Sequence, residues 1–303
     1  MATLAEKIRA RQFVITAELV PPKGIDLSEL YQKALDLKPY VDAINVTESP
    51  RARMAVAPIA VARGLIERGV EPIVQTTARD RNRLAFQADL LGAATLGIRN
   101  FVFMTGDEPG HGDHPDAKPV HDLSTVEMLR AARMLSEGRD LAGNELKGSP
   151  SLFAGATANP AASDFSREVA ATHAKIEAGA RFLQTQALYE PEALARFLEA
   201  VELGEVALLA GVLPLKSARM ALWLNENVPG IRVPERLIRE LEAASGDPEA
   251  ERQLGIDIAA RIIRQIRPYC SGIHLMAMGL ERSIPEILER SALVHRGLVD
   301  RPA

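Results

Sequence analysis

The stretch Asn100-Phe-Val-Phe-Met-Thr-Gly-Asp-Glu-Pro109 indicates how this chain folds. Its first five residues form a short apolar run, which is typical of a strand buried on both faces of a parallel sheet. The run stops at Thr105-Gly106-Asp107, where glycine permits a turn and a carboxylate follows the strand. Ligands of parallel α/β proteins bind at this carboxyl edge. Asp107 is therefore predicted either to bind a ligand or to cap the following turn.

Seven further runs of this kind occur along the chain, and each is followed by a helical pattern. Eight alternations without a break in composition predict a (β/α)8 TIM barrel that forms one domain over residues 1–303. Residues 227–246 predict an extra helical insertion between strands seven and eight. A doubly wound sheet is the alternative, but the chain lacks an early glycine-rich dinucleotide fingerprint. The predicted strands cover residues 13–19, 43–47, 72–76, 100–104, 152–157, 181–186, 206–212 and 272–276.

Composition narrows the classes of partner. The net charge is -4 and no basic run stands out, which disfavours nucleic acid and an anionic membrane as partners. The single cysteine, Cys270, excludes an internal disulfide and a site built on several thiolates of this chain. Residues 1–12 read as a short charged helix rather than a signal sequence, so we expect a cytoplasmic protein. The oligomeric state, a homo-oligomer included, is left open.

A barrel would bring a group of polar side chains together at the carboxyl ends of its strands. Most of them hydrogen-bond flat, polar heterocycles, and only two or three are plausible proton donors. No serine or cysteine has an evident His/Asp pair, which disfavours a hydrolase with a covalent nucleophile. The group consists of Glu18, Thr47, Glu48, Gln75, Thr76, Thr77, Asp107, Asn159, Gln186, Lys216 and His274.

Glu18 is the clearest candidate for acid catalysis within this group. It lies in an apolar strand, where desolvation favours the neutral, protonated carboxyl group and so suits a general acid near neutral pH. The alternative is a structural glutamate that pairs with an arginine. Gln75 and Gln186 have a similar alternative as satisfied core amides. His274 alternates with apolar neighbours, so it is predicted either to point into the barrel or to be a satisfied core histidine.

The loop at residues 110–121 contains His111, His114 and His121. Three histidines in one loop raise the alternative of a metal site. The loop is rich in glycine and proline, so it offers no rigid frame for a coordination sphere, and its hard and soft ligands are mixed. We therefore predict a solvated lid over the strand ends and no metal site.

Four short motifs occur in order on the predicted strands and carry a family resemblance. They are Glu18-Leu-Val-Pro-Pro22, Gly106-Asp107-Glu108-Pro109, Ala178-Gly179-Ala180 with Thr185-Gln186, and Gly211-Val-Leu-Pro214. In this order, they resemble the motifs of the flavin-dependent methylenetetrahydrofolate reductases. The resemblance extends from Phe13 to about Leu288, and the chain looks like a divergent branch of that family.

The resemblance implies a (β/α)8 barrel that carries FAD and reduces 5,10-methylenetetrahydrofolate to 5-methyltetrahydrofolate. By motif position, Glu18 would be the general acid that protonates the folate N10 and opens the five-membered ring. Asp107 would lie beside the flavin and the pterin, where its charge tunes the flavin and binds the amino edge of the pterin. Gln186 would contact the folate.

The same resemblance implies a set of residues that bind the cofactor. Thr47 and Gln75 would contact the isoalloxazine, and Lys175 would neutralise the FAD diphosphate. Thr77 and Asn159 are assigned to the cofactor with them.

Other positions depart from the family pattern. Gln75 stands where many members have histidine, and the sequence after Pro214 lacks the phenylalanine that stacks on nicotinamide in bacterial members. The electron donor is therefore left open between NADH, NADPH and a redox partner protein. Two alternatives remain for the function: a flavin-free, folate-dependent one-carbon or methyl transferase, and a subunit of a larger complex.

Overall fold

Eight parallel strands form a closed barrel in which each strand pairs with its sequence neighbours and β8 returns to β1. The computed structural model describes residues 2–228 and 230–293. The predicted barrel is confirmed, and each strand end lies within one residue of its predicted position. The strands are β1 (Val14–Leu19), β2 (Ala43–Val46), β3 (Pro72–Thr77), β4 (Asn100–Met104), β5 (Phe153–Ala158), β6 (Phe182–Ala187), β7 (Ala207–Val212) and β8 (Gly272–Leu275).

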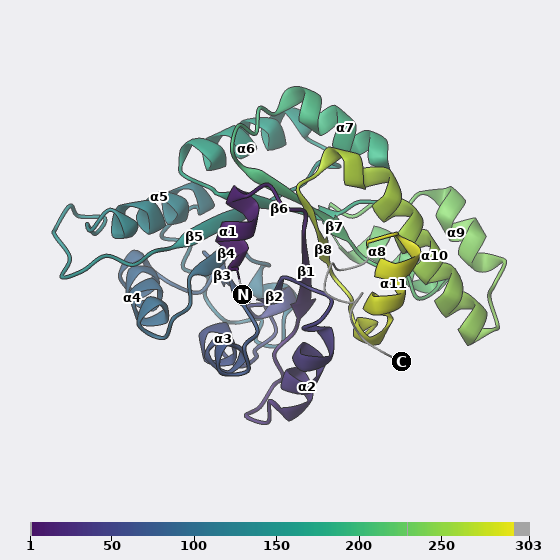
Figure 1. The fold of residues 1–303 in the computed structure, drawn as a ribbon, viewed down its shortest axis with the longest axis horizontal. Helices are drawn as coiled ribbons and strands as arrows, with labels where there is room; N and C mark the ends of the chain where they lie inside the picture. Colours follow the sequence, from purple (N-terminus) through teal and green to yellow (C-terminus); the bar gives the residue numbers. More distant parts are fainter. Residues whose placement is uncertain (1, 229, 294–303) are drawn as a thin grey trace.

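Helices surround the barrel and alternate with its strands (Figure 1). Three helices, α8 to α10, separate β7 from β8, so the predicted insertion is present and α9 lies within it. In the described part of the chain, no helix has the length and apolar character needed to cross a membrane. The helices are α1 (Leu4–Arg9), α2 (Ser28–Leu37), α3 (Pro58–Glu67), α4 (Arg83–Thr95), α5 (Thr125–Ser136), α6 (Phe165–Glu177), α7 (Pro191–Ala200), α8 (Ala218–Asn227), α9 (Glu235–Glu242), α10 (Pro248–Ile266) and α11 (Ile284–Arg290), with short 3-10 turns η1 (Pro50–Ala52), η2 (Pro109–His111), η3 (Arg267–Tyr269) and η4 (Glu281–Ser283).

Local sequence explains where several helices begin. The Asn82 side chain accepts hydrogen bonds from the backbone N–H groups of the first turn of α4. Ser124 and Glu127 form a capping box at the start of α5, in which each side chain bonds the other's backbone N–H. Such caps satisfy amide groups that a helix leaves unpaired at its amino end, and each is worth about 1 kcal/mol.

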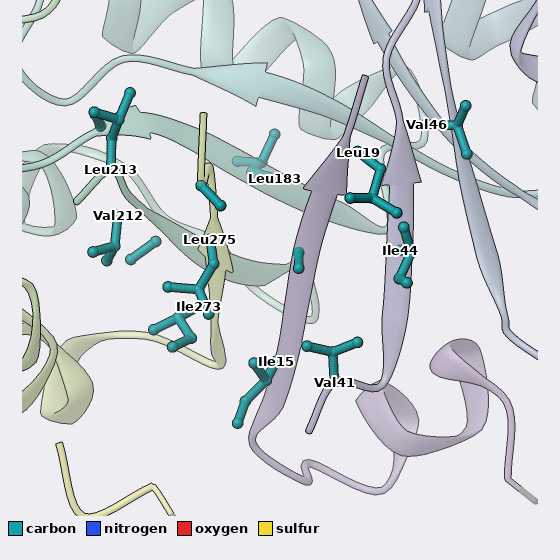
Figure 2. Packing of buried hydrophobic residues seen from close by; sticks show 14 of the residues in the cluster. Ile15, Leu19, Val41, Ile44, Val46, Leu183, Val212, Leu213, Ile273 and Leu275 are labelled. Carbon is teal, nitrogen blue, oxygen red and sulfur yellow. The ribbon is translucent and has the colours of Figure 1, made fainter. Parts of the chain in front are cut away.

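Alternate residues of each strand point outward and pack against the helices. Figure 2 shows part of this layer, including Ile15, Leu19, Ile44, Val46 and Leu275, all of them buried. Burying one such side chain contributes about 1.5 to 3 kcal/mol. The barrel is thus held from outside by a continuous apolar layer.

The other alternate residues point into the barrel, and at the amino ends of the strands they are apolar. Phe153 and Phe182 stack there with ring centroids 5.4 Å apart. Leu4 of α1 is completely buried in the same cluster and closes the base of the barrel. We call this cluster the base core; its buried members are Leu4, Val14, Ala43, Ile73, Val102, Phe153, Phe182, Ala207 and Leu209.

Two residues further along the strands, the inward positions become polar. Thr16, Asn45, Gln184 and His274 are all buried there. Gly155 of β5 lies in this polar layer as well, where an added Cβ would come within 2.6 Å of the Phe182 carbonyl oxygen. The interior therefore changes from apolar to polar between the base and the mouth.

Candidate active site

A cavity of about 390 Å³ lies at the carboxyl ends of the strands. Thr47, Thr76 and Lys216, which the sequence placed in the strand-end group, are not among its lining residues. The cavity also contacts Arg79, Lys175 and Gln184, of which Arg79 and Gln184 were not predicted. The strand-end residues that do line it are Glu18, Glu48, Gln75, Thr77, Asp107, Asn159, Gln186 and His274.

Glu18 of β1 lies in the cavity wall, with 19% of its side chain exposed. Gln75 Nε2 donates a 2.9 Å hydrogen bond to Glu18 Oε2, and His274 Nε2 lies 3.6 Å from the same oxygen. Within residues 2–228 and 230–293, no lysine or arginine forms an ion pair with Glu18. The arginine pair that the structural alternative required is therefore absent from the described chain, and the carboxyl group faces the cavity.

Glu48 lies at the end of the neighbouring strand, β2, and its carboxylate is fully engaged. It accepts hydrogen bonds from the backbone N–H (2.6 Å) and hydroxyl (2.9 Å) of Thr77. Two guanidinium nitrogens of Arg81 donate to its two oxygens at 2.7 and 2.8 Å. Only 7% of the Glu48 side chain is exposed. This carboxylate therefore links the ends of β2 and β3 and has no free oxygen for a substrate.

Arg79 follows β3, and its guanidinium is also engaged in hydrogen bonds within the protein. Its guanidinium donates two bonds to Asp80, at 2.6 and 2.7 Å, and a third to the Asp107 carbonyl oxygen at 3.1 Å. Burial opposes ionisation of Asp80, but the bonds from Arg79 outweigh it, so the pKa of Asp80 is lowered. Arg79 thus brings a fixed positive charge to the cavity wall. The signal for it in the sequence was Arg79-Asp80-Arg81 directly after a strand.

Asp107 is exposed at the mouth of the cavity, where its Oδ2 accepts a 2.7 Å hydrogen bond from the backbone N–H of Arg51. The preceding Gly106 has a φ of +90°, and an added Cβ would lie 2.9 Å from Thr77 Cβ. The Arg51 guanidinium sits 4.9 Å from the centre of the Trp223 ring of α8. Asp107 therefore anchors the loop after β2, which in turn contacts α8, the helix that precedes the insertion.

The loop at residues 110–121 is mostly exposed, but several contacts tie it to its neighbours, including backbone hydrogen bonds from Val120 and His121 to the residues after β3. Asp113 accepts a bond from Lys23 at 2.6 Å and another from the backbone N–H of Met54 at 3.0 Å. Gly112 packs so closely on the loop after β2 that a Cβ would clash with the Ala52 carbonyl oxygen. Among the described residues, no three His, Cys, Asp or Glu side chains come together in a way that could hold a metal ion.

A second positive group lines the cavity on the β5–α6 side. Lys175 of α6 donates a 2.8 Å hydrogen bond to the Thr157 carbonyl oxygen and lies 3.8 Å from Glu168. Burial lowers the pKa of Lys175, and the neighbouring Glu168 opposes that shift. Asn159 lies beside them, with its side-chain amide 3.3 Å from the Gly230 carbonyl oxygen. The wall opposite Glu18 thus carries a desolvated ammonium group and an amide.

Gln186 and Thr47 were both predicted to contact a ligand, but one of them lines the cavity and the other does not. Gln186 lines the cavity, and its Oε1 accepts a bond from the backbone N–H of Ala187. Thr47 is buried outside the cavity lining, and its hydroxyl has no hydrogen-bond partner among the described residues. A buried hydroxyl without a partner costs about 1 to 3 kcal/mol. Its role in binding a ligand stays a prediction.

Comparisons with known proteins bear on this geometry. The family model described as methylenetetrahydrofolate reductase matches residues 3–292. "Methylenetetrahydrofolate reductase 2" of Schizosaccharomyces pombe is 28% identical over 212 residues, which cover 67% of this chain and 33% of that protein. "5,10-methylenetetrahydrofolate reductase" of Pectobacterium carotovorum is 24% identical over 257 residues, or 82% of this chain and 80% of that protein. The chain thus spans about a third of the first relative and most of the second.

A solved structure shares the fold. It is an uncharacterized protein from Clostridium thermocellum that binds two copies of 5-methyl-5,6,7,8-tetrahydrofolic acid. The two structures superpose with a TM-score of 0.60 at 16% identity, covering 96% of this chain and 97% of the other. At this identity the likeness supports the barrel fold alone.

Proposed function

Because the chain belongs to the methylenetetrahydrofolate reductase family, we propose that it reduces 5,10-methylenetetrahydrofolate to 5-methyltetrahydrofolate with FAD as its redox cofactor. The observation that carries this proposal is the state of Glu18. It is a carboxyl group in the wall of a cavity, bonded to one amide and to no arginine or lysine in the described chain. A group in this state is free to give a proton to a bound substrate.

The residues present fit a flavin. The cavity volume lies within the range of roughly 300 to 1,000 Å³ typical of small-molecule sites. Its amide and hydroxyl groups suit the hydrogen-bonding edge of a flat heterocycle, which Gln75 and Thr77 would contact. Lys175 and Asn159, on the β5–α6 side, would hold the diphosphate. A contact of the isoalloxazine with Thr47 stays a prediction, because the unpartnered hydroxyl of Thr47 is buried outside the cavity lining.

Bound FAD would supply the hydride, and the chain's own residues would position the substrate and move the proton. Glu18 protonates N10 of the folate, which breaks the bond from N10 to the methylene carbon and leaves an electrophilic iminium at N5. Gln75, bonded to Oε2, keeps the carboxyl group oriented. General acid assistance of this kind is typically worth about 10²- to 10⁴-fold in rate.

Asp107 and Gln186 would bind the pterin at the mouth of the same cavity. The Asp107 carboxylate accepts hydrogen bonds only, so it suits the amino edge of the pterin, and its charge would lie beside a bound flavin. Gln186 presents an amide from β6 that would contact the folate. Arg51 holds Asp107 through its backbone N–H, which leaves the second carboxylate oxygen for the ligand.

The visible absorption spectrum of the purified protein tests the cofactor. We expect a flavin spectrum, either as purified or after addition of FAD, that is bleached by reduction and restored by methylenetetrahydrofolate under anaerobic conditions. A colourless protein that binds folate and cannot be loaded with FAD would support the flavin-free transferase instead. Reduction by a dye but by neither NADH nor NADPH would show that the donor is a partner protein.

A Glu18→Gln substitution tests the acid. The variant should keep its flavin spectrum and its reduction by the donor, while flavin reoxidation by methylenetetrahydrofolate slows by about 10²- to 10⁴-fold. The matched control is Glu137→Gln, a largely exposed glutamate at the end of α5, which should behave as the wild type. Full folate turnover in Glu18→Gln would refute the assignment.

A further inference from the structure

His274 of β8 lies beneath Glu18 and joins it to the polar layer of the barrel interior. Its Nε2 is 3.6 Å from Glu18 Oε2, and its Nδ1 is 3.0 Å from the Thr16 hydroxyl. The ring is buried, with 4% of the side chain exposed. One ring nitrogen therefore faces the cavity, and the other faces the interior.

The interior contacts determine which nitrogen carries the permanent proton. Asn45 and Gln184 exchange two amide hydrogen bonds, at 2.7 and 3.1 Å, which orient Gln184 so that its Nε2 also points at the Thr16 oxygen, 3.4 Å away. The Thr16 hydroxyl donates its own proton to the Ile273 carbonyl oxygen at 3.3 Å. The Thr16 oxygen is then left as an acceptor for Nδ1–H of His274. A hydrogen bond to one ring nitrogen fixes the tautomer of the other.

With Nδ1 protonated, Nε2 of neutral His274 presents a lone pair to Glu18. A protonated Glu18 can donate to that lone pair, whereas an ionised Glu18 can accept from Nε2–H of a protonated ring. The geometry of the two groups thus suits one shared proton in either position. Both arrangements keep Nδ1–H on Thr16, so no interior bond has to break when the proton moves.

We propose that His274 is a positioning residue that shares one proton with Glu18 and returns it to that carboxyl group for each reduction of the folate. The proposal rests on the proposed function and deepens it. Each turnover leaves a proton on N10 and an ionised Glu18. His274 is neutral at that point, and water then reprotonates its Nε2. When the next folate binds, that proton moves from Nε2 of the imidazolium to Glu18 Oε2, the N–H electron pair stays on Nε2, and His274 is again the neutral Nδ1–H tautomer.

Ligand binding provides the driving force for the proton to sit on Glu18. In the open cavity, water solvates an ion pair of Glu18 carboxylate and His274 imidazolium. A flavin and a folate that cover the cavity remove that water, and a buried ion pair costs more than its neutral form. The 3.6 Å separation is longer than a hydrogen bond, and such contacts commonly shorten when the ligand binds.

The other charged groups around the cavity are engaged elsewhere. Among residues 2–228 and 230–293, Glu18 is the acidic side chain that lies within 4 Å of a His274 ring nitrogen. The remaining charged lining residues lie on the loops after β2, β3 and β4 and on α6. They are Glu48 (bonded to Arg81), Arg79 (to Asp80), Asp107 (to the Arg51 N–H), and Glu168 with Lys175.

The pair can be tested without folate turnover, by following the histidine nitrogens of the full chain by NMR as the pH is varied. His274 is one of six histidines, and the signal lost in His274→Gln identifies it. At high pH we expect the Nδ1–H tautomer. In Glu18→Gln, protonation of His274 should occur at a pH lower by at least about one unit, because the neighbouring negative charge is gone. Thr16→Val should let both tautomers appear.

The pH profile of kcat/KM for methylenetetrahydrofolate tests the catalytic consequence. In His274→Gln, the alkaline limb should move to lower pH by about one to two units, since Glu18 must then hold its proton alone, and activity at acid pH should come within a few-fold of the wild type. His173→Gln, on the outer helix α6, is the matched control and should leave the profile unchanged. The flavin spectrum should persist in both variants.

Three results would overturn the inference. They are a titration of His274 that Glu18→Gln leaves unchanged, an Nε2–H tautomer at high pH, and an equal loss of kcat/KM at every pH in His274→Gln, which indicates a purely structural role. If His274→Gln does not fold, the Thr16→Val and Glu18→Gln spectra decide. Failure of folate reduction in the wild type would instead overturn the proposed function, while the NMR titration would still report on the pair.

Discussion

The base and the mouth of the barrel are built from the same eight strands and have opposite interiors. At the base, inward side chains are apolar and Leu4 of α1 completes their packing. At the mouth, the same strands present carboxylates, amides and an imidazole to a cavity. The difference shows how one sheet can separate stability from chemistry: a close-packed base holds the strands in place, so the mouth can carry groups that are not paired.

Two glutamates at the mouth show a similar contrast between a structural group and a group with few partners. Glu48 has hydrogen-bond donors on both oxygens, including two from Arg81, whereas Glu18 accepts one bond from Gln75. The two glutamates end neighbouring strands, so sequence position does not distinguish them. Glu48 has a structural role like that of the base, because it links the strand ends, whereas Glu18 is the carboxyl group that we propose for the substrate.

The strongest test of this contrast removes the side chain that closes the base. Leu4→Ala should lower the free energy of unfolding by about 2 to 5 kcal/mol, because it leaves a cavity in a fully packed cluster. Activity per folded molecule should remain that of the wild type. Denaturant unfolding measures the first quantity, and folate turnover at low temperature measures the second.

Leu84→Ala is the matched control, since Leu84 is 74% exposed on α4 and its removal should cost no more than about 0.5 kcal/mol. A Leu4→Ala protein that keeps its stability, or loses activity faster than it unfolds, would mean that the base and the mouth are not separate in this way.

A somewhat smaller effect is expected from Glu48→Gln, at the structural carboxylate of the mouth. Hydrogen bonds to a charged group contribute about 1.5 to 3 kcal/mol each, and the amide can replace only some of those that Glu48 accepts. We therefore expect a loss of about 1 to 3 kcal/mol in unfolding free energy, measured against Glu137→Gln. An unchanged stability would place Glu48 with the free carboxylates and weaken the contrast with Glu18.

The smallest effect is expected at Gln75, which bonds Glu18, and it tests the contrast between the two glutamates through activity rather than stability. Gln75→Met removes the hydrogen bond to Glu18 and should lower kcat/KM for the folate by about 10-fold, with little change in the unfolding free energy. Gln32→Met, on the exposed face of α2, controls for the substitution itself. If Gln75→Met were strongly destabilised instead, Gln75 would be part of the scaffold rather than of the site.

Much of the architecture could be predicted because strands and helices leave local patterns. The alternation of apolar runs, caps and glycines placed every strand end within one residue, and eight of the eleven residues predicted from the carboxyl-end rule for parallel sheets line the cavity. Thr47 was expected in the same group, but its side chain is buried outside the lining, which depends on packing that strand spacing does not reveal.

Polar residues within apolar strands indicate inward-facing positions, but the sequence does not show which of these residues pair. Thr16, Asn45 and Gln184 alternate with buried apolar neighbours, as inward-facing positions do. Their partners are 139 to 258 residues away along the chain, so their pairing was not predictable from spacing. The description of a satisfied core amide, raised as an alternative for Gln75 and Gln186, also fits Gln184, whose amide pairs with that of Asn45.

The order of residues was enough to determine eight strand–helix units and the edge at which chemistry would take place, since both follow from short-range periodicity. Closure of the barrel decided the rest: it set β8 beside β1, and so His274 beside Glu18, and it gave Arg81 to Glu48 and to no other glutamate at the mouth. Charge pairing depends on distances through space, which local pattern does not encode. The free carboxyl group can therefore be told from the committed one only after the chain has folded.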